Sequence, residues 1–170
     1  MPAGYDHKYT FARLGYNLKM TEWQGALGNS QIKRLHDFVL ARQMNHSDLF
    51  WMLGDYLEWL HFVDVVDYRF HAAPFGFPIR VLPEAPFTAR ELVVYLEKHK
   101  VGTRPVFGGN LTRQPWYANL PYVAVGDFKG ADAVMEQMFW IGCNPSMHEE
   151  HLNYIREVFR DFFKLKGLKT

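Results

Sequence analysis

The sequence predicts a single layered domain of the α/β (α+β) class, in which a small sheet is covered by helices. Three kinds of observation lead to this prediction: capping-box signals that open helices, one stretch of strict apolar alternation, and one long amphipathic stripe near the C-terminus. A length of 170 residues fits one domain with appendages and is enough to bury a hydrophobic core.

The N-terminal part is predicted to be mainly helical. Residues 1–20 show no clean periodicity and form an irregular N-terminal segment. The capping box Thr21-Glu22-Trp23-Gln24 then opens a helix over 22–34, and an imperfect 3.6-residue period predicts a second helix over 37–57. Residues 58–70 fit the end of a helix or a strand equally well.

Strands and helices alternate in the C-terminal part. Apolar residues at every second position over 75–81 predict a strand, and Pro78 within it favours an edge of the sheet. The capping box Thr88-Ala89-Arg90-Glu91 opens a helix that ends near His99. Three further elements are predicted: a strand over 104–107, a helix over 131–139 and a strand over 140–143.

The final helix has the clearest pattern. A third capping box, Ser146-Met147-His148-Glu149, is predicted to open it. Its apolar stripe consists of Leu152, Ile155, Phe159 and Phe162. His148 and His151 superficially resemble a zinc motif, but the zinc-protease pattern places its histidines four residues apart and these are three apart. We therefore predict no metal site in this chain.

The composition excludes several classes of protein. Nineteen Lys and Arg residues against 18 Asp and Glu give a formal net charge of +1, which argues against nucleic-acid binding and polybasic membrane attachment. Cys143 is the single cysteine, so neither an internal disulfide framework nor a self-contained cysteine-ligated metal cluster can form. With no signal peptide and no apolar run long enough to span a membrane, the expected location is cytoplasmic.

Two stretches of the sequence could bind an anion. The first, Gly15–Thr21, places Asn17 and Lys19 just before a helix N-terminus, where backbone amides favour negative charge. The alternative for it is an ordinary turn with a solvated lysine. The second, 102–114, places Arg104 and Arg113 around a Gly-Gly-Asn turn, and it reads equally as a phosphate site or an exposed loop.

Longer motifs add to these local signals. The stretches concerned are Tyr5–Thr10, Gly15–Thr21, Phe75–Pro78, Gly102–Arg104, Phe107–Pro115 and Phe139–Gly142. Through them the sequence resembles the DegT/DnrJ/StrS sugar aminotransferase family. Within it, the chain is most similar to the nucleotide-linked 4-dehydro-6-deoxyhexose 3-dehydratases, such as CDP-4-dehydro-6-deoxyglucose 3-dehydratase. The resemblance runs from about Gly4 to Phe163 and implies an aspartate-aminotransferase-like fold. Residues 21–170 would be its linking helices and small C-terminal domain, with the large cofactor domain absent.

The resemblance also implies roles for individual residues. Asn17 matches an asparagine that contacts the phosphate of the cofactor, pyridoxal or pyridoxamine phosphate (PLP/PMP). The positions expected to contact substrate are Lys19, Phe75, Arg104, Asn110 and Arg113. The catalytic residue, a histidine in the dehydratases and a lysine in the aminotransferases, lies upstream of the match, as do the cysteines of a [2Fe–2S] cluster. No catalytic residue is therefore expected in this chain.

By this resemblance the chain is the C-terminal portion of a PMP-dependent 3-dehydratase that removes the C3 hydroxyl of a sugar for lipopolysaccharide or deoxysugar biosynthesis. Alone it is expected to be inactive. The implied partners are a nucleotide-linked sugar, a second copy in a homodimer or a separate large-domain chain, and an iron–sulfur flavin reductase. The alternatives are part of a PLP-dependent sugar aminotransferase, or a stand-alone module that binds a nucleotide-sugar or a partner without catalysis. A domain separated from its partner should expose an unusually large apolar surface.

Overall fold

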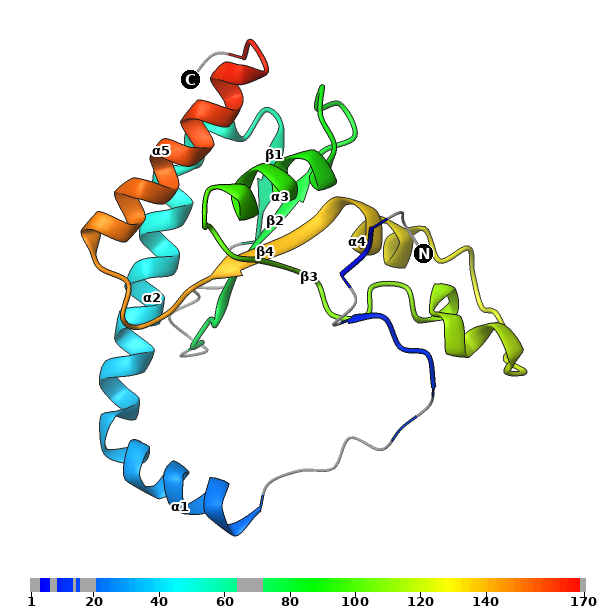
Figure 1. Cartoon of the computed structure of the whole chain (residues 1–170), viewed down its shortest axis with the longest axis horizontal. Coiled ribbons are helices and arrows are strands. Elements are labelled where there is room, and N and C mark those ends of the chain that lie inside the picture. The colour runs from blue at the N-terminus through cyan, green and yellow to red at the C-terminus, as the bar shows by residue number, and fades with distance from the viewer. Residues whose placement is uncertain (1–3, 7–8, 14, 16–20, 64–71, 169–170) are drawn as a thin grey trace.

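A four-stranded antiparallel sheet with the order β1-β2-β4-β3 forms the centre of the chain (Figure 1). The computed structural model describes residues 4–6, 9–13, 15, 21–63 and 72–168. The strands are β1 Leu60–Phe62, β2 Gly76–Val81, β3 Thr103–Pro105 and β4 Met138–Gly142. The α-helices are α1 Glu22–Gln31, α2 Leu35–Met52, α3 Ala89–Lys98, α4 Lys129–Gln137 and α5 Glu149–Leu165. The short 3₁₀ helices are η2 Ile32–Arg34, η3 Gly54–Tyr56, η4 Leu111–Arg113 and η5 Pro115–Asn119.

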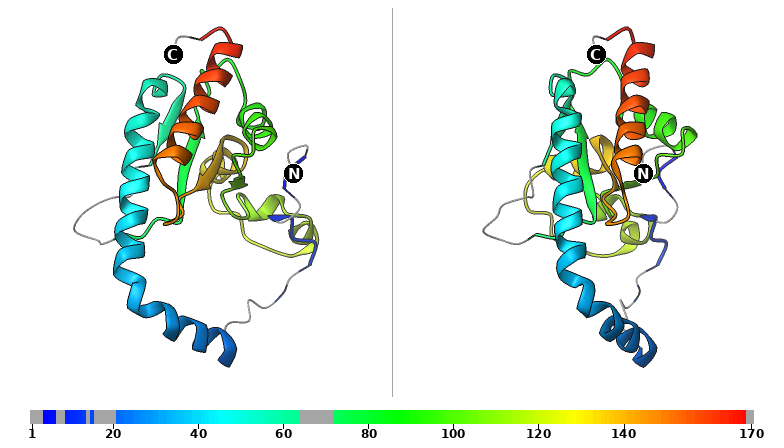
Figure 2. Two further views of the ribbon diagram at one scale, coloured as in Figure 1. Left: turned by 60° about the vertical axis from the view of Figure 1, so that its left-hand side comes forward. Right: turned by 90° about the vertical axis from the view of Figure 1, so that its left-hand side faces the viewer.

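One face of the sheet carries the hydrophobic core. Alternate residues of β2 and β4 point into it, and Phe77, Ile79 and Ile141 are at most 1% exposed. Helices α2 and α5 lie side by side over this face, and α3 packs against α5 and both β3 and β4 (Figure 2). The α/β layered prediction of a small sheet covered by helices is confirmed.

The other face of the sheet, called here the open face, consists of residues that stay half-buried or exposed. It includes His61, Pro78, Arg80, Arg104, Met138 and Trp140. These residues alternate with the core residues because successive side chains of a strand point to opposite faces. The open face is therefore available for contacts with a ligand or with another part of a larger protein.

Two of the three predicted capping boxes are present. The Thr21 backbone amide donates to Gln24 Oε1 at 2.8 Å, and the Thr88 amide donates to Glu91 Oε2 at 2.8 Å. The prediction that Ser146 caps α5 was wrong. The Ser146 amide instead donates to Asn144 Oδ1 at 2.8 Å in a turn, and α5 begins two residues later, after His148.

Pro78 was predicted to mark an edge strand, and this was wrong, because β2 lies between β1 and β4. The register explains how the sheet accommodates a proline there. Strand β1 pairs with β2 only from Ile79 to Val81, so Pro78 lies beyond that pairing and has Trp140 of β4 opposite it. A residue without an amide hydrogen is tolerated where one side of the strand needs no donor.

Several predicted boundaries shift by a few residues. Helix α2 ends at Met52, five residues earlier than predicted, because Gly54 begins a separate 3₁₀ turn. The ambiguous stretch after it contains the short strand β1. Strand β3 ends at Pro105 instead of residue 107, since Phe107 adopts a left-handed backbone with φ of 48°.

Helix α1 projects away from the sheet (Figure 1). None of its residues is buried, and Trp23 and Leu27 are 87% and 61% exposed. On α2, the exposed Leu40, Met44 and Trp51 lie on the side opposite the buried Leu49, as their spacing of four and eleven residues requires. The apolar stripe formed by these residues of α1 and α2 is without cover from the rest of the described chain.

Candidate functional site

An aromatic cluster lies at one end of the open face. Phe75, which precedes β2, meets the Trp140 ring edge-to-face with ring centroids 5.2 Å apart, and Phe107 lies 6.3 Å away in a similar geometry. Both phenylalanines are more than half exposed. Aromatic side chains left on the surface in a group provide a contact surface for an apolar or ring-shaped ligand.

Trp140 contacts Phe75 of this cluster and also lies beside strand β3. Arg104 lies directly opposite Trp140 in the β3–β4 register, so the two side chains share the open face. Gly76 is required beside the indole, because a Cβ there would lie 2.5 Å from Trp140 Cε3. The indole Nε1 is buried and has no hydrogen-bond partner within the ranges that the structure describes. Sequence reasoning included Trp140 only within the family motif Phe139–Gly142 and assigned it no role at the site, because an apolar strand residue carries no local sign of its surroundings.

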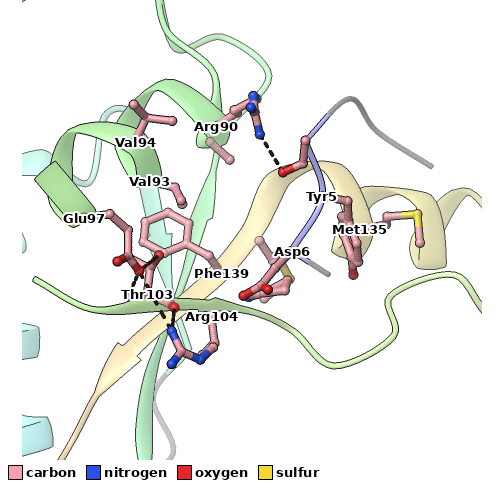
Figure 3. A pocket seen from close by; sticks show the side chains of 14 residues that line it. Tyr5, Asp6, Arg90, Val93, Val94, Glu97, Thr103, Arg104, Met135 and Phe139 are labelled. Atoms are coloured by element: carbon pink, nitrogen blue, oxygen red, sulfur yellow. Dashed lines mark hydrogen bonds and ion pairs between the residues drawn. The ribbon is translucent and has the colours of Figure 1, made fainter. Parts of the chain in front are cut away.

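A pocket of about 500 Å³, the β3 pocket, opens beside the edge strand β3 (Figure 3). Its walls come from α3, β3, the start of β4 and the N-terminal residues Gly4, Tyr5 and Asp6. Apolar side chains including Val93 and Phe139 form much of its surface. Burial, followed by the charge of Asp6, raises the pKa of Tyr5 above its usual value, so its hydroxyl stays protonated at neutral pH.

Arg104 lines the β3 pocket and is about one-third exposed. Its Nη1 donates to the Thr103 carbonyl at 2.6 Å and lies 4.0 Å from Glu97 Oε1. Glu97 Oε1 in turn accepts from the Thr103 amide and hydroxyl, at 2.6 and 2.8 Å. The carboxylate is thus held by β3, and the guanidinium keeps donors that could meet an anionic ligand.

The loop that follows β3 is fastened to α4 by Asn110 and Arg113. Asn110 is 4% exposed, its Nδ2 donates to Asp132 Oδ1 at 2.8 Å, and its Oδ1 accepts from the Thr112 amide and hydroxyl. Arg113 forms ion pairs with Glu136 and Asp132, and the hydrogen bond to Glu136, followed by that to Asp132, raises its pKa. The hydrogen bond from Asn110, and then that from Arg113, lowers the pKa of Asp132. Two carboxylates around one guanidinium give this cluster a net charge of −1, which disfavours an added anion.

Gln114, the next residue of this loop, was also missed. It is 1% exposed, and its carboxamide bonds to backbone groups of residues near the N-terminus. Sequence analysis included Gln114 only as one residue of the family motif Phe107–Pro115 and assigned it no role. Its partners Tyr9 and Phe11 lie more than 100 residues away, so no local pattern identifies them.

The structure thus separates the predicted site residues into groups. Phe75 and Arg104 lie on the open face, both next to Trp140. Asn110 and Arg113 lie together against α4. Asn17 and Lys19 lie outside the described residues.

His148 and His151 lie at the start of α5, where His151 Nδ1 accepts from the His148 amide at 3.2 Å. The ranges that the structure describes contain no group of three or more His, Cys, Asp or Glu residues arranged to hold a metal. Within the same ranges no helix is both long enough and apolar enough to cross a membrane.

Comparisons with known proteins identify relatives along almost the whole chain. The family model described as the DegT/DnrJ/EryC1/StrS aminotransferase family matches residues 2–160. The chain is 42% identical to the lipopolysaccharide biosynthesis protein RfbH of Salmonella typhimurium strain LT2, over 97% of this chain and 38% of that protein. It is 37% identical to the dTDP-4-dehydro-2,6-dideoxy-D-glucose 3-dehydratase of Saccharopolyspora spinosa, over 95% of this chain and 35% of the relative.

Solved structures show the same fold. The E. coli GDP-4-keto-6-deoxy-D-mannose 3-dehydratase with bound hydrated PLP matches 89% of this chain and 38% of its own, with a TM-score of 0.69 and 21% identity. An aminotransferase from Psychrobacter cryohalolentis matches 89% of this chain and 40% of its own, with a TM-score of 0.72 and 17% identity. The chain spans little more than a third of the length of the relatives it matches. It belongs to the DegT/DnrJ/EryC1/StrS aminotransferase family.

Proposed function

We propose that this chain is the C-terminal portion of a PMP- or PLP-dependent 3-dehydratase that acts on a nucleotide-linked 4-dehydro-6-deoxyhexose. The observation that carries the proposal is the similarity to the S. spinosa 3-dehydratase, at 37% identity over 95% of this chain. The likeness to aminotransferase structures lies below 25% identity and supports the fold alone. The alternative of a sugar aminotransferase is therefore less well supported.

In this proposal Arg104 and Phe75 contact the nucleotide-linked sugar. Arg104 offers a forked cation for a phosphate group, and Phe75 with Trp140 offers ring surface for a sugar or base. Asn17 as a cofactor-phosphate ligand and Lys19 as a substrate contact stay predictions, as do Asn110 and Arg113. For Asn110 and Arg113, substrate contact requires them to exchange their present bonds to Asp132 and Glu136.

PLP or PMP supplies an electron sink when it is bound. The residue of this chain predicted to contact it, Asn17, lies outside the described residues, so we assign no described side chain to the cofactor. The catalytic side chain, and the ligands of a [2Fe–2S] cluster if the protein carries one, would lie in the remaining part of the protein. Burial raises the pKa of the one cysteine, Cys143, to about 11, so it is a poor metal ligand.

The test begins with the coding sequence immediately upstream of codon 1 at the native locus. We expect it to continue in frame, and the complete protein with PMP to release water from a CDP- or dTDP-linked 4-dehydro-6-deoxyhexose. The 170-residue chain alone should not. Amino transfer by the complete protein would favour the aminotransferase alternative. A stop codon just before codon 1 would favour a stand-alone module or a separate large-domain partner.

A further inference from the structure

The segment of residues 9–13 is held against the body of the molecule by one buried side chain, that of Gln114. Gln114 Nε2 donates to the Tyr9 carbonyl and to the Gly108 carbonyl, both at 2.9 Å, and Oε1 accepts from the Phe11 amide at 3.0 Å. The carboxamide therefore uses both of its N–H donors and its oxygen, within a site that excludes water.

Neighbouring contacts extend this attachment in both directions. The Trp116 amide donates to the Phe11 carbonyl at 3.2 Å. Tyr5 Oη donates to the Phe107 carbonyl at 3.1 Å, and the Tyr9 ring meets the Phe107 ring edge-to-face at 6.4 Å. Tyr5, Tyr9 and Phe11 thus contact the loop 107–116, and only Gln114 among the residues that make these contacts is fully buried.

Residues 4–6, which precede the attached segment in the chain, form part of the β3 pocket. Tyr5 and Asp6 make the wall of the pocket that faces Arg104 and Met135 (Figure 3). At Gly4, the carbonyl accepts from Arg90 Nη1 at 2.8 Å, which closes the same wall against α3. The volume and the lining of the pocket therefore depend on where residues 4–6 lie.

We propose that Gln114 is the positioning residue of the β3 pocket. Its carboxamide fixes Tyr9 and Phe11, and this holds Tyr5 and Asp6 as the wall beside Arg104. The proposal deepens the proposed function, on which it rests for the ligand: a fixed wall sets the affinity of the pocket for the nucleotide part of the substrate. Gln114 itself touches no ligand in this scheme.

The isosteric substitution Gln114→Glu tests the proposal, because it preserves shape and removes both donors. An ionised carboxylate would face the Tyr9 and Gly108 carbonyls, which repel it, whereas a protonated one could donate to one of them. Gln43→Glu is the matched control. Gln43 Nε2 donates to the Ala72 carbonyl at 2.8 Å, so the control removes an amide donor to a backbone carbonyl far from the pocket.

The measurement is amide hydrogen exchange by NMR on the full 170-residue chain, between pH 4 and 7. We expect Gln114→Glu to speed exchange of the Trp116 amide about 10-fold at pH 7, with partial recovery at low pH. Tyr9–Phe107 ring contacts should be lost, while the Ile79 amide of the core keeps its rate. A general loss of stability would instead speed exchange at Ile79 as well. That outcome, or an unchanged Trp116 rate, would overturn the positioning role.

A titration with dTDP separates this inference from the proposed function. We expect dTDP to shift the amide signals of Arg104 and Val93 in the wild-type chain and in Gln43→Glu, with an affinity about 10-fold lower in Gln114→Glu. Unchanged affinity in a variant whose segment is released would overturn the claim that the wall controls binding. If dTDP shifts nothing in the wild-type chain, the proposed role of Arg104 fails, and the exchange data still decide the role of Gln114.

Discussion

Glu91 and Lys166 join the first turn of α3 to the end of α5, with Lys166 Nζ 2.6 Å from Glu91 Oε1. Glu91 also accepts from the Thr88 amide as part of its capping box. The hydrogen bond from Lys166, and then that from Thr88, lowers the pKa of Glu91 to about 2. One carboxylate therefore both caps a helix and connects two helices that cover the sheet.

This pair predicts a pH dependence of stability. Because the folded pKa lies below the unfolded value near 4.5, the carboxylate stabilises the folded state above pH 4.5 and loses that effect as pH falls toward 2. The side chain is about half exposed, so Glu91→Gln should cost only about 1 kcal/mol at pH 7. Urea unfolding at pH 7 and pH 2.5 tests this, and an equal cost at both pH values would contradict it.

Two phenylalanines should differ sharply when truncated. Phe163 is 0% exposed and its ring stacks on Tyr56 with centroids 4.1 Å apart, whereas Phe75 is 54% exposed. Phe163→Ala should lower the free energy of unfolding by about 3–5 kcal/mol. Phe75→Ala should change it by about 0.5 kcal/mol or less. A cost of several kcal/mol for Phe75→Ala would show that the residue is kept for packing and not for contact with a ligand.

The loop 107–114 should be sensitive to a single methyl group. Gly109 has φ of 57°, and a Cβ there would lie 2.8 Å from Met135 Cβ. Gly109→Ala should therefore destabilise the chain by about 1–3 kcal/mol, because it adds backbone strain to a steric overlap. Gly102→Ala is the control, since a Cβ at Gly102 meets nothing within 4 Å. Thermal unfolding that gives the same midpoint for both variants would contradict this account.

The apolar stripe on α1 and α2 should make the isolated chain prone to self-association. Trp23 and Trp51 are 87% and 77% exposed, and exposed apolar patches of this kind mark interaction surfaces. We expect the chain to bind a hydrophobic dye and to self-associate with increasing concentration. The double substitution Trp23→Ser and Trp51→Ser should reduce both. If the chain binds no more dye than ordinary monomeric proteins do, this would argue against the view that another part of the complete protein covers the stripe.

Arg104 gives a prediction for the complete enzyme. If it binds a phosphate group of the substrate, Arg104→Gln should raise KM about 10- to 100-fold, as expected for loss of a charge-assisted hydrogen bond. Arg156→Gln, at an exposed position on α5, should leave KM unchanged. Steady-state kinetics on both variants decides, and an unchanged KM for Arg104→Gln would remove Arg104 from the substrate site.

The sequence predicted those parts of the fold that depend on nearby residues. The apolar stripe of α5 could be predicted because Leu152, Ile155 and Phe159 all lie on one buried face of a single helix. The capping box at Thr88 could be predicted because its two residues lie within one helical turn. Strand β1 could not be predicted, because its three residues give too few apolar alternations to distinguish a strand from the end of a helix. Pro78 misled the prediction, since its tolerance depends on where a neighbouring strand stops.

The candidate site was predictable only in part, for a similar reason. Phe75 and Arg104 came from family motifs, and their meeting at Trp140 is a consequence of strand register. Likewise, the contacts of Asn110 and Arg113 with α4 could be predicted only if the position of that helix, about 20 residues further along the chain, were known. Pairings of this kind are set by tertiary structure, which a periodic pattern in a single segment does not encode.

The attachment of Phe11 to Gln114 also sets an order of events during synthesis. These residues are 103 positions apart, so at about 5–20 residues per second the ribosome makes Gln114 roughly 5–20 s after Phe11. Closing a loop of that length in an unfolded chain costs about 4 kcal/mol of entropy. Binding of residues 9–13 to Gln114 therefore has a small entropy cost only after the strands of the sheet have formed and brought the two regions together. Residues 9–13 are made before the sheet but complete their folding after it, and until then the β3 pocket lacks one wall.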